Sequence, residues 1–356
     1  MNRLAQTPLD SIYYVVSEKI LRGISMKKRI IALFIVSLMI CSLCGCKKKD
    51  GLTEINLTEV AHSIFYAPMY VAIEEGYFEE EGLKINLVNG LGADKTMTAV
   101  LSGNADIGFM GSEASIYVYN EGEKDYVVNF AQLTQRAGNF LVARNQEGTF
   151  EWTDLVGKKV IGGRIGGMPQ MVFEYILKKN QINPYKDIDM ITNIDFGITS
   201  QSFMAGTGDY TIEFEPAATG IELEGQGQVV ASLGVDSGYV PYTAYSAKLS
   251  YIKENQEVIQ KFVNALQKGM DYVQSHTAEE IAAVIQPQFA ETDLSKITLI
   301  VTRYKDQDTW KDNLIFEEES FELLQDILEL AGELSSRAPY QKLVDITYAT
   351  KAYDSK

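Results

Sequence analysis

The sequence predicts an α/β fold made of two α/β units, followed by a run of helices. Two observations support this prediction. Apolar residues first alternate and then recur at helical spacing, once from Ile55 onward and again from Val160 onward. Past Tyr242, only the helical period remains. Strands and helices that alternate at this spacing indicate parallel sheets with helices on their faces.

The first unit begins with an alternating strand from Ile55 to Glu59. Pro68 in a first turn and Gly76 at the end mark a helix over 67–75. Ser112 is placed to cap a later helix. Between these points we expect a strand over 83–87, a helix over 95–102 and a strand over 106–110.

The second unit starts with a strand at 160–162 and a helix over 168–179. Strands are expected near 188–191, 210–214 and 229–231, and helices over 252–274, 278–285, 294–304 and 318–334. The chain should cross between the units near 142–146 and again near 239–245. The predicted division is therefore lobe 1 over 53–143, lobe 2 over 144–240, and a return to lobe 1 with C-terminal helices over 241–356.

A separate signal lies ahead of the fold. Lys27, Lys28 and Arg29 precede an apolar run over 30–43, which is of the length of a secretory signal and shorter than the roughly 20 residues that a spanning helix needs. Leu43-Cys44-Gly45-Cys46 resembles the lipobox of bacterial lipoproteins. The resemblance implies a signal peptide over 26–45, a diacylglycerol on Cys46 and a lipidated tether over 46–52. The alternatives are a short membrane anchor and a buried helix.

Residues 1–25 do not fit this signal, because export signals stand at the N-terminus. We expect translation to start at Met26, so that 1–25 is a miscalled extension. The alternative is a genuine extension, which would give a membrane-anchored precursor.

Composition excludes several classes of function. The net charge is −16, and the first 46 residues hold six basic and only two acidic residues, so the remainder is more acidic still. Such a surface repels nucleic acid. All three cysteines lie at or before Cys46, which argues against disulfides, cysteine nucleophiles and cysteine zinc sites in the fold. With only His62 and His276 besides, we expect no metal, no cofactor and no catalytic residue.

Three segments carry a family resemblance. They are YAPMYVAIEEGYFEEEGLKINLV (66–88), LSGNADIGFMGSEA (101–114) and DLVGKKVIGG (154–163). In this order and spacing they resemble the NMT1/THI5-like substrate-binding proteins, which include receptors for aliphatic sulfonates, nitrate and thiamine-precursor pyrimidines. The match spans roughly residues 50–250.

The resemblance implies a type II periplasmic-binding-protein fold, in which two α/β lobes joined by a two-strand hinge close over one small molecule. It also implies a monomer that serves an ABC importer, with a permease and an ATPase as partners, on the extracytoplasmic face of the cell membrane. Eukaryotic relatives are enzymes that make a thiamine pyrimidine. Their cysteine-rich motif is missing here, so we expect no enzyme activity. A signalling receptor is a third possibility.

In lobe 1, the candidate ligand-binding residues follow strand ends. His62 could donate a hydrogen bond, and Tyr66 could stack on a ring. Gly92 permits close approach of the backbone, while Ser112 and Glu113 open a helix. For His62 and Ser112, structural roles are equally open.

In lobe 2 and near the crossings, the candidates are more highly charged. Arg164 could fork onto an anion within the glycine-rich stretch that holds Gly166 and Gly167. In a strand, Glu213 and Glu215 would project to one side. The remaining candidates are Asp195, Arg136 and Tyr242.

These residues favour different ligands. Arg164, Arg136 and helix N-termini suit a sulfonate, nitrate or carboxylate. Tyr66 and the acids Glu113, Glu213 and Glu215 suit a flat, amino-bearing heterocycle. Because an unpaired buried carboxylate costs several kcal/mol, roughly, both sets cannot face a bare anion. The sequence slightly favours the heterocycle.

Overall fold

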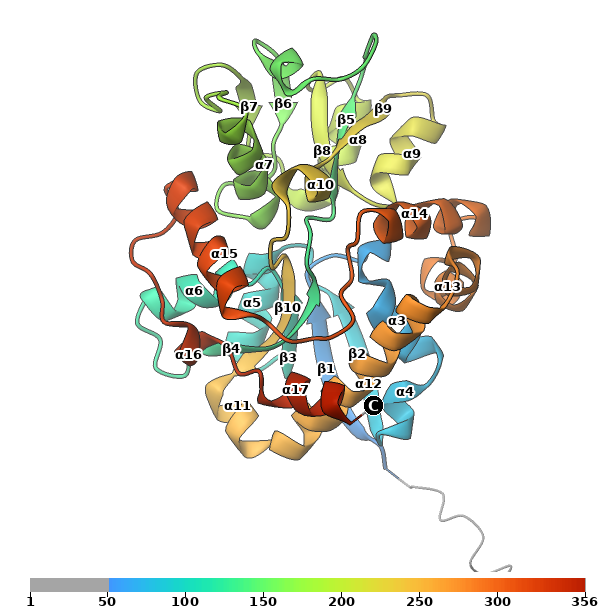
Figure 1. Cartoon of the computed structure of the whole chain (residues 1–356), viewed down its shortest axis with the longest axis vertical. Helices are drawn as coiled ribbons and strands as arrows, with labels where there is room; N and C mark the ends of the chain where they lie inside the picture. The colour runs from blue at the N-terminus through green and yellow to red at the C-terminus, as the bar shows by residue number, and fades with distance from the viewer. Residues whose placement is uncertain (1–50, 356) are drawn as a thin grey trace, which may run out of the picture. The chain divides into compact units, whose positions relative to one another are not determined.

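The computed structural model describes residues 51–355, so the predictions for 1–45 and for Cys46 lie outside the described residues. Residues 52–356 form one compact unit. It contains two five-stranded sheets, one in each lobe (Figure 1). Within the described residues, every helix is too short or too polar to cross a membrane.

The lobe 1 sheet has the order β2-β1-β3-β10-β4. β1 pairs in parallel with β2 and β3, whereas β10 runs antiparallel to β3 and β4. Its strands are β1 (Thr53–Glu59), β2 (Leu83–Asn89), β3 (Ile107–Met110), β4 (Val127–Thr134) and β10 (Thr243–Lys248).

The lobe 2 sheet has the order β7-β6-β8-β5-β9, with β5 antiparallel to its two neighbours. Its strands are β5 (Asn139–Ala143), β6 (Lys159–Ile161), β7 (Asp189–Ile191), β8 (Tyr210–Phe214) and β9 (Gln228–Ser232). Because β5 belongs to this sheet, the chain crosses between the lobes over 135–138, a few residues before the predicted crossing at 142–146. It returns over 238–242, close to the prediction.

Helices cover both sheets (Figure 1). In lobe 1 they are α3 (Ala67–Glu74), α4 (Tyr77–Glu80), α5 (Ala93–Ser102), α6 (Glu113–Asn120), α11 (Leu249–Glu254), α12 (Gln256–Ser275), α13 (Ala278–Ile285), α16 (Tyr340–Leu343) and α17 (Thr347–Asp354). In lobe 2 they are α7 (Met168–Lys179), α8 (Thr199–Met204), α9 (Ala217–Leu223) and α10 (Leu233–Ser237). Short 3-10 turns lie at Ile64–Tyr66, Trp152–Leu155, Phe196–Ile198 and Gln286–Phe289.

Helix boundaries follow local sequence signals. Pro68 stands in the first turn of α3, as predicted, because its fixed φ suits that position. Gly76 does not simply stop the chain there; at φ 73° it turns it into the short α4. The predicted cap at Ser112 is wrong: its side chain makes no capping bond, and its hydroxyl instead donates to the carbonyl of Pro241 at 3.4 Å.

The last two long helices, α14 (Leu294–Asp306) and α15 (Glu318–Ala331), do more than return the chain to lobe 1. α15 packs on α7 of lobe 2, and α14 lies beside α9 (Figure 1). The described chain therefore contacts lobe 2 a second time after leaving it.

The end of α14 also binds both crossing strands. The Tyr304 hydroxyl donates to the carbonyl of Gly138 at 2.9 Å, and the backbone N–H of Gln135 donates to the carbonyl of Thr309 at 2.9 Å. From the returning strand, the Tyr239 hydroxyl donates to Asp308 at 2.6 Å. We call residues 303–309 the hinge brace. The predicted two-strand hinge is thus held by a third segment.

Candidate functional site

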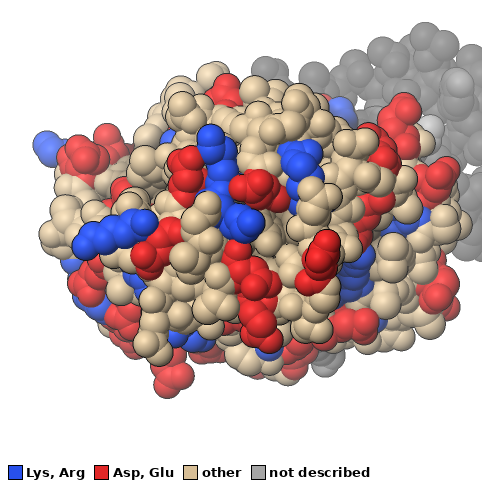
Figure 2. Space-filling model, turned by 90° about the horizontal axis from the view of Figure 1, so that it is seen from above, with Lys and Arg blue, Asp and Glu red and all other residues tan. Residues whose placement is uncertain are grey.

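The candidate site is a cleft between the lobes, made of three adjoining cavities. Seen from above, the molecule carries basic and acidic side chains interspersed on its surface (Figure 2). We name two of the cavities after a buried acid in their lining and the third after its position. The Glu213 chamber has a volume of about 170 Å³, the Glu113 chamber about 50 Å³ and the outer cavity about 480 Å³. Arg164 lines all three.

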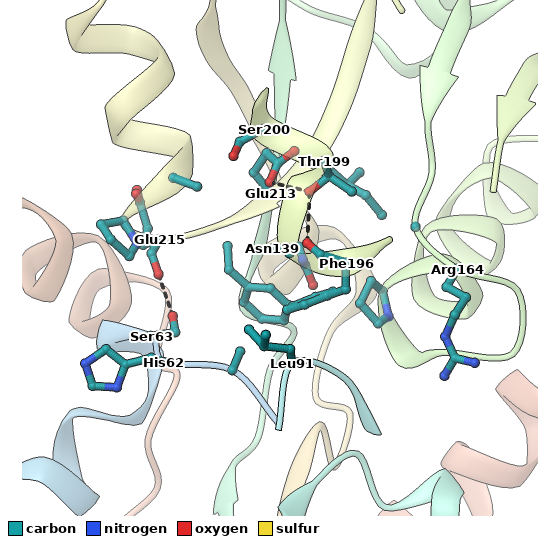
Figure 3. A pocket seen from close by; sticks show the side chains of 18 of the residues that line it. His62, Ser63, Leu91, Asn139, Arg164, Phe196, Thr199, Ser200, Glu213 and Glu215 are labelled. Atoms are coloured by element: carbon teal, nitrogen blue, oxygen red, sulfur yellow. Dashed lines mark hydrogen bonds between the residues drawn. The ribbon is translucent and has the colours of Figure 1, made fainter. Parts of the chain in front are cut away.

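The Glu213 chamber lies where loops after β1, β2 and β8 meet (Figure 3). Parallel strands commonly gather ligand contacts at their carboxyl ends. Its lining includes Ala61, His62, Ser63, Asn89, Leu91, Asn139, Arg164, Phe196, Thr199, Ser200, Glu213, Phe214 and Glu215.

Glu213 is the buried acid of this chamber, with 5% of its surface exposed. Its two carboxylate oxygens accept hydrogen bonds from Thr211 Oγ1 at 2.7 Å and Thr199 Oγ1 at 3.0 Å. Burial raises the pKa of Glu213 to about 7, while the two hydroxyls oppose that rise. Both of these hydroxyl partners are neutral, so the carboxylate keeps its capacity to bind a charged or amino-bearing donor.

Glu215 lies two residues further on, but its carboxylate already accepts hydrogen bonds from other residues of the protein. Arg303 Nη1 donates to Oε1 at 2.9 Å, and the backbone N–H and hydroxyl of Thr219 donate at 2.9 and 2.8 Å. Arg303 also binds Glu222 at 2.7 Å. We call Glu215, Thr219, Glu222 and Arg303 the Glu215 corner. This arrangement gives Glu215 a structural role, and a contact of its carboxylate with ligand stays an untested prediction.

The Glu113 chamber has aromatic walls. Phe214 packs edge-on against Phe196 with ring centroids 5.7 Å apart, and Phe65 lies 5.7 Å from both Phe214 and Tyr242. Aromatic side chains offer flat faces on which a planar ring can stack. Phe196 and Phe214 line both chambers, so they form the wall that the two share.

Glu113 sits at the start of α6 with 2% of its surface exposed. Burial raises its pKa to about 7, against the opposing effects of its own N–H, the Met168 N–H and the charge of Arg164. Among the described residues, its Oε2 atom has no hydrogen-bond partner, and neither does the Tyr66 hydroxyl in the same chamber.

Arg164 is the cation of the cleft. Its side chain is 46% exposed, and its Nη2 atom lies 3.4 Å from Asp94 Oδ1 across the lobes. The Tyr117 hydroxyl also crosses, donating to the carbonyl of Gly166 at 3.0 Å, and Ser63 Oγ donates to the carbonyl of Glu215 at 2.5 Å. The lobes are therefore in direct contact around the cleft.

His62 lines the Glu213 chamber, but both of its ring nitrogens are engaged. Nδ1 donates to Glu59 at 2.8 Å and Nε2 donates to the carbonyl of Gln288 at 2.8 Å. The bond to Glu59 raises the pKa of His62, while burial raises that of Glu59. The ring also stacks on Phe289. His62 therefore lines the chamber with its ring and has no free ring nitrogen to offer a ligand.

The other predicted residues divide into two groups. Gly92, Gly167, Tyr66 and Tyr242 line the Glu113 chamber, and Gly166 lines the outer cavity. Arg136, Asp195 and Ser112 are absent from the linings of the three cavities, which the described residues form. Arg136 donates to the carbonyl of Gly234 at 3.0 Å and lies over the Tyr239 ring. Its position beside both crossing strands explains why it does not reach the ligand cavities.

Sequence reasoning missed Thr199, Asn139 and Arg303. Thr211 and Glu213 stand two apart on β8 and so share a face, which is a signal that could have identified Thr211 as a partner. Asn139 accepts a hydrogen bond from the Tyr242 hydroxyl in the second crossing. Thr199 and Arg303 come from segments distant in sequence, so no local pattern marks them.

The fold agrees with comparisons to known proteins. A family model described as NMT1/THI5 like matches residues 64–280. YtlA of Bacillus subtilis (strain 168), which carries the name of a binding protein, is 47% identical over 315 residues, covering 88% of this chain and 94% of YtlA. The chain belongs to the NMT1/THI5-like family.

Two further comparisons give more distant similarities. The alkanesulfonate-binding protein SsuA from Xanthomonas axonopodis pv. citri, solved with MOPS bound, superposes with a TM-score of 0.68 at 13% identity, covering 83% of this chain and 99% of SsuA. This likeness confirms the predicted type II periplasmic-binding-protein fold. The 4-amino-5-hydroxymethyl-2-methylpyrimidine phosphate synthase of Aspergillus parasiticus is 24% identical over 225 residues, covering 60% of this chain and 64% of the enzyme.

Among the described residues, no group of three His, Cys, Asp or Glu side chains is placed to hold a metal ion. This NMT1/THI5-like cleft is lined by the buried acids Glu113, Glu213 and Glu215, by aromatic side chains, and by the guanidinium of Arg164, which pairs with Asp94.

Proposed function

We propose that this protein is an extracytoplasmic solute receptor that captures a small molecule between its lobes and delivers it to an ABC importer. The family membership and the 47% identity to YtlA, named as a binding protein, support this role. So does the cleft, whose cavities open between two lobes joined by two crossing strands. The role requires binding and release, and no chemical step.

The ligand that fits this cleft is a flat heterocycle bearing amino groups, of the pyrimidine class. The observation that carries this proposal is Glu213, a buried carboxylate in the Glu213 chamber that accepts hydrogen bonds from two neutral hydroxyls. An amino or ring N–H donor would give it a charge-assisted bond. The adjoining rings of Phe196 and Phe214 would contact the face of the ligand.

A small anion such as a sulfonate or nitrate is the second candidate. Arg164 favours it, because this guanidinium lines every cavity of the cleft. SsuA, which shares the fold, was solved with the sulfonate MOPS. Against it stand the 3.4 Å pairing of Arg164 with Asp94 and the buried acids Glu113 and Glu213, which would repel an anion.

A pyrimidine-synthesising enzyme of the THI5 type is a weaker alternative. The Aspergillus parasiticus synthase shares 24% identity with part of the chain. The enzymes of this group carry a cysteine-rich motif, whereas every cysteine here lies at or before Cys46. The same relative nevertheless supports a pyrimidine-like ligand, since its name describes a pyrimidine product.

A thermal-shift screen of the purified protein tests the ligand class. Aminopyrimidines, aliphatic sulfonates, nitrate and riboflavin-like rings would be compared at equal concentrations. A compound present at 100 times its Kd adds about 2.7 kcal/mol to the free energy of unfolding. We expect stabilisation by aminopyrimidines alone. Stabilisation by sulfonates or nitrate, with none from the pyrimidines, would establish the anion role instead.

Lipid attachment at Cys46 is tested separately. Changing Cys46→Ala should leave an unprocessed precursor without the lipid, seen as a larger product by immunoblot that takes up no label from palmitate. Ser63→Ala is a matched control, because it changes a residue within the fold and leaves the signal intact. A membrane-bound, fully processed Cys46→Ala protein would disprove the lipobox interpretation.

A further inference from the structure

Glu113 is a buried acid for which the protein supplies too few partners. It is 2% exposed, and its Oε2 atom has no hydrogen-bond partner among the described residues. Native proteins satisfy most buried polar atoms, so an orphaned carboxylate oxygen needs a specific explanation. Its position in a cavity supplies one, because the missing partner can come from a bound molecule.

The local backbone is built to hold this carboxylate where it is. The side chain of Glu113 folds back over Gly111, and a Cβ atom at that glycine would lie 2.1 Å from Oε2 and 2.6 Å from Oε1. Any larger residue at 111 would displace the carboxylate. The orphaned oxygen therefore occupies a fixed place in the wall of the Glu113 chamber.

A second polar group without a partner points to the same place. The Tyr66 hydroxyl, fully buried in the wall of that chamber, also lacks a hydrogen-bond partner among the described residues. The charge of Glu113 contributes to the raised pKa of Tyr66, so the two groups lie within electrostatic reach. Together they present an acceptor and a hydroxyl to one small volume.

The nearby cation does not fill this position. Arg164 Nη2 pairs with Asp94 Oδ1 at 3.4 Å, at the border of the outer cavity. The outer cavity also contains Glu121 and Glu333, so its lining is rich in acids. A positively charged group entering the cleft from this side would meet carboxylates before it reached Glu113.

Glu213 and Glu113, the two cleft acids considered for ligand binding, lie in different chambers. Glu213 lines one, Glu113 lines the other, and Phe196 and Phe214 line both. A single ring in the Glu213 chamber would leave the Glu113 oxygen unsatisfied. Satisfying both acids requires a molecule that extends past the shared aromatic wall.

We propose that Glu113 is a specificity-determining residue that binds an amine-bearing arm of the ligand, so that the receptor selects two-ended molecules: a flat amino ring at Glu213 and a cationic arm at Glu113. This inference rests on the proposed function for the ring and adds the second contact. The arm's ammonium donates to Oε2 of Glu113, and the Tyr66 hydroxyl lies beside it. Binding keeps Glu113 ionised.

Two probes that differ only in the arm test this assignment. They are 4-amino-5-(2-aminoethyl)pyrimidine and 4-amino-5-propylpyrimidine, in which a methyl group replaces the amine. Kd values would be measured by calorimetry at pH 8 for the wild type, Glu113→Gln and Glu213→Gln. A charge-assisted bond gives the aminoethyl probe an advantage of at least about tenfold in the wild type. Glu113→Gln should remove that advantage, whereas Glu213→Gln should weaken both probes alike.

The outcomes separate the two proposals. Equal binding of both probes to the wild type disproves the role of Glu113 and leaves the ring ligand intact. If the aminoethyl probe keeps its tighter binding in Glu113→Gln, the role of Glu113 is likewise disproved and the ring ligand is left intact. Failure of the wild type to bind either probe overturns the ring ligand and this inference with it. Glu254→Gln, a change to an exposed acid outside the linings of the three cavities, is the matched control and should keep the advantage.

A measurement on the wild type alone covers the case in which Glu113→Gln does not fold. The ratio of the two Kd values should favour the aminoethyl probe increasingly as pH rises from 5.5 to 8.5, because Glu113 ionises over this range. Glu213 affects both probes and cancels in the ratio. A ratio that stays constant across this range would overturn the proposal.

Discussion

The Glu213 chamber and the Glu215 corner place two acids, two residues apart in sequence, in opposite surroundings. Both carboxylates are almost fully buried. Glu213 receives two neutral hydroxyls, whereas Glu215 receives a guanidinium, a backbone N–H and a hydroxyl. A buried charge whose counter-charge is in place is satisfied by the protein, and removal of that counter-charge is costly. The partners of these two acids, more than their burial, therefore distinguish them.

The largest expected effect comes from breaking the Glu215 corner. Changing Arg303→Met leaves Glu215 buried without its cation, which should lower the free energy of unfolding by about 3 to 5 kcal/mol. Arg337→Met, which removes an arginine from an exposed acidic cluster, is the matched control and should cost less than about 1 kcal/mol. Urea unfolding measures both. If the two losses were equal, the corner would have no special structural role.

The dependence of the free energy of unfolding on pH tests the other acid of this comparison, Glu213. Because the folded-state pKa of about 7 exceeds the ordinary value of 4.5, the folded protein keeps this proton longer than the unfolded chain does. Stability should therefore fall as pH rises from about 4.5 to 7 and stay lower above it. Glu213→Gln should be more stable than the wild type at pH 8, by on the order of 2 to 3 kcal/mol, and equal to it at pH 4.

Chemical denaturation at several pH values measures the difference in free energy of unfolding between Glu213→Gln and the wild type. Glu113 also titrates near pH 7, but it is present in both proteins and cancels in the difference. A Glu213→Gln variant that was less stable than the wild type at pH 8 would show that Glu213, like Glu215, contributes to the fold.

A smaller effect is expected from Thr199→Val, which removes one of the two hydroxyls that bind Glu213. At pH 8 the loss should be about 1 kcal/mol, since one hydrogen bond to a buried carboxylate disappears. The pH midpoint of the stability decrease should also move upward. Thr298→Val, at an exposed helix position, is the control and should change neither quantity. An unchanged midpoint in Thr199→Val would mean that Thr199 does not affect the titration of Glu213.

Much of the fold could be predicted from the sequence because its signals are local. The expected strands near 55–59, 83–87 and 210–214 correspond to β1, β2 and β8, and Pro68 marked the start of a helix that the structure contains. The predicted lobe boundary at 143 and 144 put residues 139–143 in lobe 1, whereas they form β5 of the lobe 2 sheet, because an apolar segment does not encode which sheet it joins. The positions of α14 and α15 against lobe 2 depend on packing between distant segments, which periodicity does not report.

The candidate site was predictable to the level of loops. Glu113, Arg164 and Glu213, which the sequence analysis selected, line adjoining cavities, and carboxyl ends of parallel strands commonly converge in this way. The sequence could not distinguish Glu213 from Glu215, since the deciding partner, Arg303, lies 88 residues further along the chain. Nor could it show that both nitrogens of His62 are occupied. Whether the named residues contact a ligand stays a prediction.

The hinge brace has a consequence for where this protein can be cut. The family model matches residues 64–280, a span that omits β1, which lies between β2 and β3 in its sheet, and omits the whole of α14. A fragment trimmed to those bounds would split the lobe 1 sheet, remove Arg303 from Glu215 and remove the contacts of the hinge brace with both crossing segments. The bounds of the family model are therefore unsuitable as the ends of an expressed fragment.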